Sequence, residues 1–195
     1  MKKIITISRE FGAGGGEIGR RVAENLKFEY FDKALILDAA KEVNADVEKV
    51  VESDEKAPFL AGFSKALFDF YNKPLNEKLF DAQRNVIRKI AEHGSCVIVG
   101  RNANAILREF DNALHVFIHA DEYWRMNRLK KEKMQDVSES KILQDIANVD
   151  KIRRKYCAYF TATDFGVARY YDVCLDSSTL GIDACVDMIC NLARA

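Results

Sequence analysis

The sequence of 195 residues lacks an excess of charge of either sign, because 30 lysines and arginines balance 30 aspartates and glutamates. A general nucleic-acid binder or membrane-surface binder would show a basic excess, so the balance argues against both classes. No apolar run is long enough to span a bilayer, and Arg9 with Glu10 interrupts any signal-peptide core behind the first residues. These absences predict a cytoplasmic protein that binds neither nucleic acid nor membrane.

Cysteine and histidine motifs are also missing. The five cysteines form no C-x-x-C pair, which predicts reduced and mostly buried thiols. Of the three histidines, His115 and His119 would share one face of a strand, but a metal site needs a further ligand. Such a pair is more typical of strand residues than of a metal centre.

Apolar strands and amphipathic helices alternate along the chain, which favours an α/β fold with a parallel sheet. The hydrophobic content of 48% suits one domain with a substantial core. The pattern predicts strands over residues 4–7, 29–31, 96–99, 114–118 and 173–175. It predicts helices over residues 17–26, 33–42, 47–53, 75–92, 122–133, 138–160 and 182–193.

Residues 33–73 are the best candidate for an inserted helical subdomain, because they separate the first strand–helix unit from the next clear central strand. The alternative is further helical packing on one side of the sheet. Asp32 is a candidate cap for the first helix of this stretch. The aromatic-rich segment 59–71 suits either a core or an interface, which leaves monomer and homodimer both open.

A glycine-rich loop lies between the first predicted strand and the first predicted helix. A helix start offers free backbone N–H groups and the positive end of the dipole, and glycine lets a phosphate approach the backbone closely. This layout is that of a P-loop, although the loop lacks the lysine and hydroxyl of the G-x-x-x-x-G-K-[ST] pattern. The alternative is a turn that binds nothing. The predicted phosphate-binding residues are Gly12, Ala13, Gly14, Gly15, Gly16 and Glu17.

Arginines recur where a ligand crevice is expected. Arg101 follows the strand 96–99, and residues just past the carboxyl end of a parallel strand face such a crevice; the alternative is a surface salt bridge. Arg125 and Arg128 share one face of a basic helix. This helix is a candidate for a mobile lid that stabilises charge on a transferring phosphoryl group, or else a solvated charged helix.

A further cluster lies on the long predicted helix, where Asp150 and Arg153 share a face and Arg154 lies close by. A carboxylate at this place can accept a hydrogen bond from a base amino group while an arginine holds a phosphate. The alternative is an ion pair within the helix, which would contribute about 0.2–0.5 kcal/mol.

These motifs occur in one order along nearly the whole chain, and together they resemble those of the cytidylate kinase group of nucleoside monophosphate kinases. The resemblance is closer to the cytidylate kinase-like family, whose loop has the form S-R-E-F-G-x-G-G-G-E-I and is matched by residues 8–18. The motifs that carry it are Ile5-Thr6-Ile7, Gly12-Ala13-Gly14, Val99-Gly100-Arg101, Arg125-x-x-Arg128, Asp150-x-x-Arg153 and Leu175-Asp176-Ser177-Ser178-Thr179-Leu180.

The resemblance implies a P-loop kinase-type three-layer fold: a five-stranded parallel sheet, a helical insert for the nucleoside monophosphate within residues 33–73, and a helical lid over residues 121–137. It implies transfer of the γ-phosphoryl group of ATP, with Mg²⁺, to CMP or dCMP. The acceptor-binding residues that it implies are Arg101, Asp150 and Arg153, with Arg154 nearby, and the phosphate clamp that it implies is Arg125 and Arg128.

The chain departs from cytidylate kinases at three positions. Gly15 stands where their loop has lysine, Glu17 where it has a hydroxyl, and Val99 where a carboxylate precedes Gly-Arg. Arg9, at the first glycine position of the loop pattern, is the predicted replacement cation. Glu17 is a candidate Mg²⁺ ligand, because Mg²⁺ prefers hard oxygen ligands; alternatively it caps the helix and competes with phosphate.

The sequence therefore predicts a kinase that uses Mg-ATP on a nucleotide-like acceptor, with small-molecule nucleotides as its partners. The absent lysine favours a rival, a sensor of nucleotides or phosphometabolites that kept the fold and lost transfer. A kinase for another small-molecule acceptor is the third hypothesis, because one fold hosts many substrates.

Overall fold

A computed structural model describes residues 1–36 and 75–195 of the chain. Most of the predicted insert, residues 33–73, lies outside the described residues, together with the predicted helix 47–53 and the aromatic-rich segment. Asp32, the predicted cap, accepts a hydrogen bond from the backbone N–H of Ala34 at 3.0 Å. Residues 33–36, the first four of the predicted helix 33–42, are helical.

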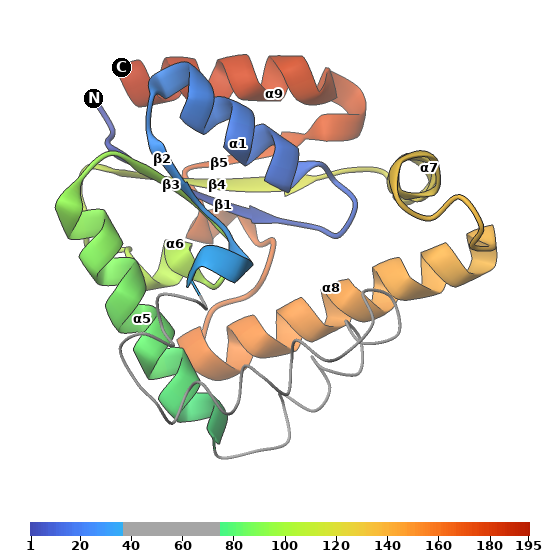
Figure 1. Cartoon of the computed structure of the whole chain (residues 1–195), viewed down its shortest axis with the longest axis horizontal. Coiled ribbons are helices and arrows are strands. Elements are labelled where there is room, and N and C mark those ends of the chain that lie inside the picture. The colour runs from blue at the N-terminus through green and yellow to red at the C-terminus, as the bar shows by residue number, and fades with distance from the viewer. Residues whose placement is uncertain (37–74) are drawn as a thin grey trace.

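The described residues form a five-stranded parallel sheet between two layers of helices (Figure 1). Helices α1 and α9 cover one face of the sheet, α5, α6 and α8 lie on the other, and α7 stands beyond its end. The strands are β1 Ile4–Arg9, β2 Glu29–Phe31, β3 Cys96–Val99, β4 Ala113–His119 and β5 Val173–Asp176, in the spatial order β2-β3-β1-β4-β5. The helices are α1 Gly15–Leu26, α5 Leu75–His93, α6 Ala103–Ile106, α7 Glu122–Glu132, α8 Glu139–Thr161 and α9 Ser177–Arg194, with a 3₁₀ turn at Ala168–Tyr170.

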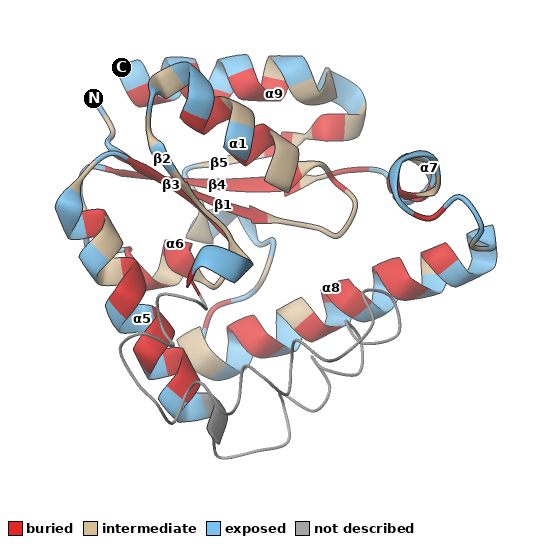
Figure 2. Cartoon of the chain, viewed as in Figure 1, coloured by how far each residue is buried: buried red, intermediate tan, exposed pale blue. Residues whose placement is uncertain are grey.

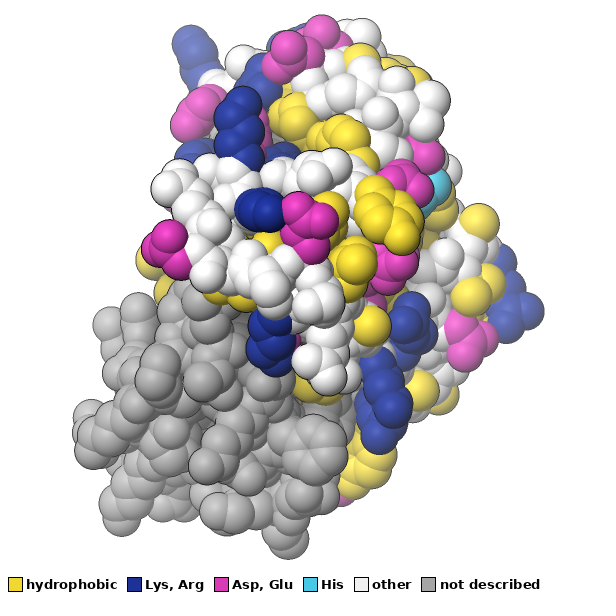
Figure 3. Space-filling model, turned by 90° about the vertical axis from the view of Figure 1, so that its right-hand side faces the viewer, with side chains coloured by type: hydrophobic (Ala, Val, Ile, Leu, Met, Phe, Trp, Pro, Cys, Tyr) yellow, Lys and Arg dark blue, Asp and Glu magenta, His cyan; other side chains and the backbone are white. Residues whose placement is uncertain are grey.

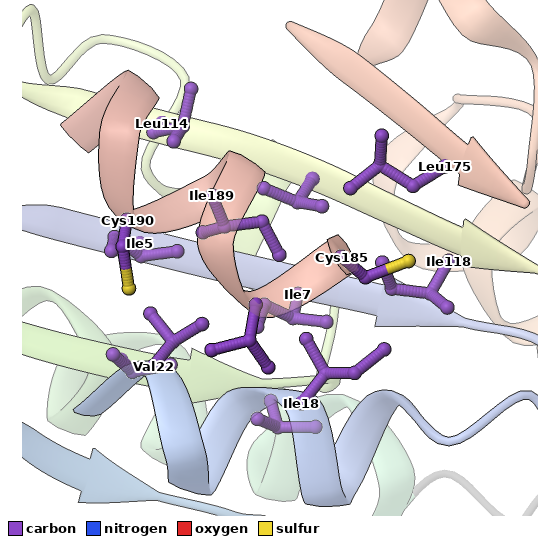
Figure 4. Packing of buried hydrophobic residues seen from close by; sticks show 14 of the residues in the cluster. Ile5, Ile7, Ile18, Val22, Leu114, Ile118, Leu175, Cys185, Ile189 and Cys190 are labelled. Carbon is purple, nitrogen blue, oxygen red and sulfur yellow. The ribbon is translucent and has the colours of Figure 1, made fainter. Parts of the chain in front are cut away.

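The core lies on both faces of the sheet. Ile5 and Ile7 of β1 point toward α1 and α9, where they pack with Ile18 and Val22 (Figure 4). Ile4 belongs to a second cluster on the opposite face, beneath α5. Because both faces are covered, the inner strands are continuous apolar runs, as the sequence predicts for a parallel sheet. Figure 2 shows the buried residues gathered in the sheet and on the inward sides of the helices.

The cysteines belong to this interior. All five are free, and four of them are buried. Burial raises the pKa of the Cys96 thiol to about 12. The prediction of mostly buried thiols is therefore confirmed.

Capping side chains define the starts of α8 and α9. Ser138 caps α8, and its hydroxyl accepts a hydrogen bond from the backbone N–H of Lys141 at 3.4 Å. The sequence predicts the last helix over residues 182–193, whereas α9 begins at Ser177 and is broken at Gly181 (φ 80°, ψ 160°). The earlier start has a local cause, because the side chain of Asp176 accepts hydrogen bonds from the first backbone N–H groups of this helix.

The topology brings the polar segments of the chain to one edge of the sheet. The register pairs Ile7 of β1 with Val99 of β3, and Arg9 of β1 with Ile118 of β4. The carboxyl ends of these three parallel strands therefore meet, and the loops that follow them lie side by side. In an open α/β sheet this edge is where ligands bind.

No helix within residues 1–36 and 75–195 is both long enough and apolar enough to cross a membrane. On the face of the molecule in Figure 3, lysine and arginine side chains are interspersed with acidic ones rather than joined into a continuous basic surface.

Candidate active site

The glycine-rich loop joins β1 to α1 and leaves the first turn of α1 open. Gly12 and Gly14 have positive φ angles of 83° and 81°, a backbone conformation that glycine adopts without strain. Gly14 is the N-cap of α1 and no side chain caps this helix, so its first N–H groups have no acceptor within the helix. These amides border a cavity of about 490 Å³, here called the glycine-loop cavity. Its walls come from the loop, α7 and α8.

Backbone conformation favours glycine at position 14. Its φ of 81° is one that residues with a side chain rarely adopt, and a Cβ atom there would lie 2.5 Å from Ile182 Cδ1 and 2.6 Å from Arg128 Nη1, so both side-chain ends would have to move. The absence of a side chain keeps the backbone within reach of a bound anion. The geometry is the one that the predicted phosphate cradle requires, and its occupancy by phosphate stays a prediction.

Arg9 crosses from the glycine loop to the end of β3. Its stem passes over Gly15, where a Cβ atom would lie 2.6 Å from the Arg9 Cβ. Its guanidinium lies against Gly100, where a Cβ atom would overlap Arg9 Nη1. Glycine at these two positions therefore makes room for one arginine. The side chain begins beside the position that carries lysine in cytidylate kinases and ends outside the loop.

The guanidinium of Arg9 reaches a second cavity of about 90 Å³, here called the arginine cavity. The residues that line it are Ser8, Arg9, Lys33, Val99, Gly100, Arg101, Asn102, Arg153, Tyr156 and Phe165. Four of these described lining residues are basic and none is acidic. Burial, together with the cations of Arg153 and Arg101, lowers the pKa of Arg9 to about 9. Such crowding of like charges is relieved when an anion binds.

Arg101, which follows β3, lines the arginine cavity, and its role in acceptor binding stays a prediction. The cavity also contains residues that the sequence analysis missed. Tyr156 lies three residues after Arg153 on α8, and this helical spacing could have placed it on the same face of the helix. Phe165 and Lys33 come from segments with no such signal. Arg154 is exposed and lines neither cavity, so the structure does not bring this predicted acceptor residue to the site.

The two arginines of α7 point to different places, although they were predicted to act as one clamp. Arg125 is 7% exposed, and its Nη1 lies 2.6 Å from Asp150 Oδ2 and 3.2 Å from the carbonyl oxygen of Phe11. Its Nε lies 3.7 Å from Glu10 Oε2. The arrangement differs from the prediction because carboxylates from the loop and from α8 converge on this guanidinium behind the loop.

Arg128 keeps the position that a phosphate clamp requires. It lies against Gly14 and lines the glycine-loop cavity. Its Nη2 donates hydrogen bonds to Glu17 Oε2 at 2.6 Å and to Glu132 Oε2 at 3.1 Å. The positive charge above the loop is therefore already paired with two carboxylates.

The Asp150 carboxylate has protein partners at both oxygens. Oδ1 accepts a hydrogen bond from the backbone N–H of Phe11 at 2.8 Å, and Oδ2 accepts one from Arg125. Arg153 lies 3.7 Å from Oδ1 and donates a hydrogen bond to the carbonyl oxygen of Arg9 at 2.8 Å. These contacts differ from the predicted recognition of a base by Asp150, because its two oxygens already accept hydrogen bonds from the loop and from α7.

Glu17 is the only carboxylate in the first turn of α1. It pairs with Arg128, and more distantly with Arg21 at 3.7 Å. Within residues 1–36 and 75–195 no group of three or more histidines, cysteines, aspartates or glutamates is arranged to hold a metal ion. A single carboxylate still suits Mg²⁺, which usually takes one or two protein carboxylates and fills its other positions with water and phosphate oxygens.

The two histidines of β4 contact neighbouring side chains of the sheet. His115 is buried, and its Nδ1 lies 2.8 Å from the hydroxyl oxygen of Thr6. Burial lowers the pKa of His115. The ring of His119 stacks on Phe117.

A strand, a glycine loop and a helix at the carboxyl edge of a parallel sheet of order 2-3-1-4-5 define a P-loop kinase fold. The solved structures agree. Shikimate kinase from Bacteroides thetaiotaomicron matches with a TM-score of 0.57 and 13% identity over 100% of both chains. Shikimate kinase from Acinetobacter baumannii in complex with shikimate matches with a TM-score of 0.50 and 13% identity, over 100% of this chain and 94% of that one. At such identities the likeness concerns the fold alone.

The chain belongs to the cytidylate kinase-like family, whose model matches residues 4–179. An uncharacterized protein from Eubacterium ventriosum has a TM-score of 0.77 and 27% identity, with 98% of each chain covered. No curated protein matches the sequence. The predicted fold class and family are both confirmed.

Proposed function

We propose that the chain is a phosphotransferase that moves the γ-phosphoryl group of ATP to a small phosphorylated acceptor, with CMP and dCMP as the first candidates. The observation that carries the proposal is the path of Arg9. Its side chain lines both the glycine-loop cavity and the arginine cavity. A group that passes from a donor in one cavity to an acceptor in the other would move along this guanidinium.

The glycine-loop cavity is the proposed donor site. The open amides of α1 and the glycines with positive φ suit the oxygens of a triphosphate. Only the stem of Arg9 lies beside Gly15, so its guanidinium, which lies at Gly100, would act on the γ-phosphoryl group from the side of the arginine cavity. When Mg²⁺ is bound, Glu17 would hold it through a carboxylate oxygen, and the ion would neutralise charge on the phosphates.

The arginine cavity is the proposed acceptor site. Arg101 and Arg153 stand there with Arg9, and an acceptor dianion would reduce the repulsion among the three guanidinium groups. Forked arginine donors match phosphate oxygens in pairs. Tyr156 and Phe165 add aromatic surface at the same cavity.

The reaction requires little covalent help from the protein. An acceptor phosphate oxygen attacks the γ-phosphorus, the bond from that phosphorus to the β,γ-bridging oxygen breaks, and ADP leaves with the electron pair of that bond. Catalysis of such a transfer is mainly positioning and stabilisation of charge on the phosphoryl oxygens. Arg9 lies between the two sites where that charge develops, which suits the role of a catalytic cation.

A second candidate is a sensor that binds nucleotide without transfer. The pairing of Arg128 with Glu17 and Glu132 favours it, because a neutralised arginine stabilises a phosphoryl group less. A kinase for another small acceptor is the third candidate.

One assay separates these functions. The protein is incubated with Mg-ATP and a panel of CMP, dCMP, other nucleoside monophosphates and shikimate, and ADP is followed. ADP formation that depends on CMP or dCMP supports the proposal, and dependence on another acceptor supports the third candidate. A rise in melting temperature with ATP, without turnover on any acceptor, supports the sensor. Arg84→Ala, on the exposed side of α5, is the control variant.

A further inference from the structure

The entry to the glycine loop is held from behind by side chains of α7 and α8. Asp150 accepts a hydrogen bond from the N–H of Phe11, and Arg125 donates one to the carbonyl oxygen of the same residue. Arg153 donates a hydrogen bond to the carbonyl oxygen of Arg9. Backbone groups immediately before Gly12 are therefore fixed by residues that are more than 100 positions away in the sequence.

Together with Glu10, these side chains form one chain of alternating charge with a buried centre. Glu10, Arg125, Asp150 and Arg153 follow one another with separations of 3.7, 2.6 and 3.7 Å. Arg125 and Asp150 are 7% and 3% exposed, so solvent screens their attraction little. Loss of one member leaves the next as a buried charge with fewer partners, which is strongly destabilising for the local arrangement.

We propose that Asp150 is a positioning residue that sets the conformation of the glycine loop and thereby its affinity for phosphate. The inference rests on the proposed function, because it assigns to Asp150 a role at the donor site instead of the acceptor site. Asp150 acts through Phe11, the residue directly before the first glycine with positive φ. It also joins α7 to the loop through Arg125.

Two roles of Asp150 make opposite predictions about the ligands that are affected. A carboxylate that recognises the acceptor would change the affinity for CMP and leave the binding of a bare polyphosphate unchanged. A carboxylate that positions the loop would change the binding of polyphosphate and leave the affinity for CMP nearly unchanged. Inorganic tripolyphosphate is therefore the discriminating probe, because it carries no base or sugar.

The first experiment needs no ligand. Hydrogen–deuterium exchange of the full chain is compared for wild type, Asp150→Ala and Asp150→Asn, with Lys151→Ala as the control on the exposed side of the same helix. We expect peptides covering residues 9–17 to exchange about 10-fold faster in Asp150→Ala, because a charge-assisted hydrogen bond is lost. Asp150→Asn keeps one acceptor oxygen, so the exchange rate of these peptides should rise less. If Asp150→Ala does not fold, the comparison of Asp150→Asn with wild type tests the inference. Unchanged exchange in this segment of the folded variants would overturn the inference.

The second experiment is titration calorimetry with tripolyphosphate and, separately, with CMP. We expect the affinity of Asp150→Ala for tripolyphosphate to fall about 10- to 100-fold, with a smaller fall in Asp150→Asn and none in Lys151→Ala. A variant that loses affinity for CMP alone would overturn the positioning role. If wild type itself binds no tripolyphosphate, the proposed phosphate site fails, whereas the exchange measurement still tests the tie between Asp150 and the loop.

Discussion

The arginines of α7 and the arginines of the arginine cavity differ in how much of their charge is already compensated. Arg125 lies between Asp150 and Glu10, and Arg128 lies between Glu17 and Glu132. In the arginine cavity, Arg9 is crowded by Arg101 and Arg153, and the described lining contains no carboxylate. The α7 arginines are thus compensated by carboxylates, whereas Arg9 and Arg101 line a cavity whose described lining has no carboxylate. Arg153, which lines the same cavity, lies 3.7 Å from Asp150 outside it.

This difference favours the strand ends, rather than α7, as the place where an anion would meet uncompensated positive charge. A buried cation with an ion-pair partner gains little from a second anion, whereas cations that repel one another gain from the first. The expected order of importance for phosphoryl transfer is therefore Arg9 first, the acceptor arginines next, and the α7 arginines last. Five variants test this order, from the largest expected effect to the smallest.

Replacing Arg9 should have the largest effect. Arg9→Ala removes a cation that lines both cavities, and we expect the rate of ADP formation with acceptor to fall by about 10³-fold. Steady-state kinetics of the proposed reaction measures it, beside Arg84→Ala as the matched arginine control. A rate close to that of wild type would remove Arg9 from the catalytic role.

Gly100→Ala should displace Arg9 without removing it. The new methyl group would overlap Arg9 Nη1. Alanine would also be strained at this position, because Gly100 has a φ of 85°. We expect a loss of roughly 10²-fold in the transfer rate, because a displaced cation no longer stabilises the phosphoryl group. Gly94→Ala is the control, since Gly94 also has a positive φ but no heavy atom lies within 4 Å of its Cβ position. Equal losses in the two variants would show that backbone strain, and not Arg9, is responsible.

Replacing Arg101 and replacing Arg128 should distinguish the roles of the two cavities. We expect Arg101→Ala to raise the KM for the acceptor about 10-fold with little change in the KM for ATP, because it removes a charged hydrogen-bond donor from the arginine cavity alone. Arg128→Ala should change the KM for ATP instead. A rise in both constants in either variant would contradict the assignment of donor and acceptor sites.

Glu17→Gln should have the smallest effect, and it should be a gain. Without the carboxylate, Arg128 is released toward the glycine-loop cavity, and a half-exposed ion pair of this kind contributes about 0.2–1 kcal/mol. We expect tripolyphosphate to bind a few-fold more tightly in the absence of Mg²⁺, with the gain shrinking at high salt. Weaker binding in calorimetry would mean that Glu17 supports the site rather than competes with phosphate.

The sequence was sufficient for the sheet and for the place of the loop. The apolar runs before Ser8 and before Gly100 predict the strands whose carboxyl ends border the site, and the glycines between Phe11 and Glu17 predict the turn into α1. These features depend on local periodicity and on backbone conformation, which are readable from neighbouring residues.

The direction of the charged side chains was not readable in the same way. Helical spacing places Arg125 and Arg128 on one face of α7, yet the first turns to Asp150 and the second to Glu17. Each partner lies at least 25 residues away in the sequence, so no local pattern announces the pairing. Glu10, at the start of the loop, pairs with Arg125 of α7, and this pairing too joins residues that are far apart in the sequence.

Because the side chain of Arg9 passes close over Gly15, the effects of substitutions at these two positions should be coupled. A lysine introduced at position 15 alone would place its Cβ 2.6 Å from the Cβ of Arg9, so it would collide with the side chain that it is meant to replace. Arg9→Gly alone would leave the loop without either cation. Only the double variant, Arg9→Gly with Gly15→Lys, transfers the cation from the end of β1 to the start of α1. The effects of the two single substitutions on the transfer rate should therefore be strongly non-additive.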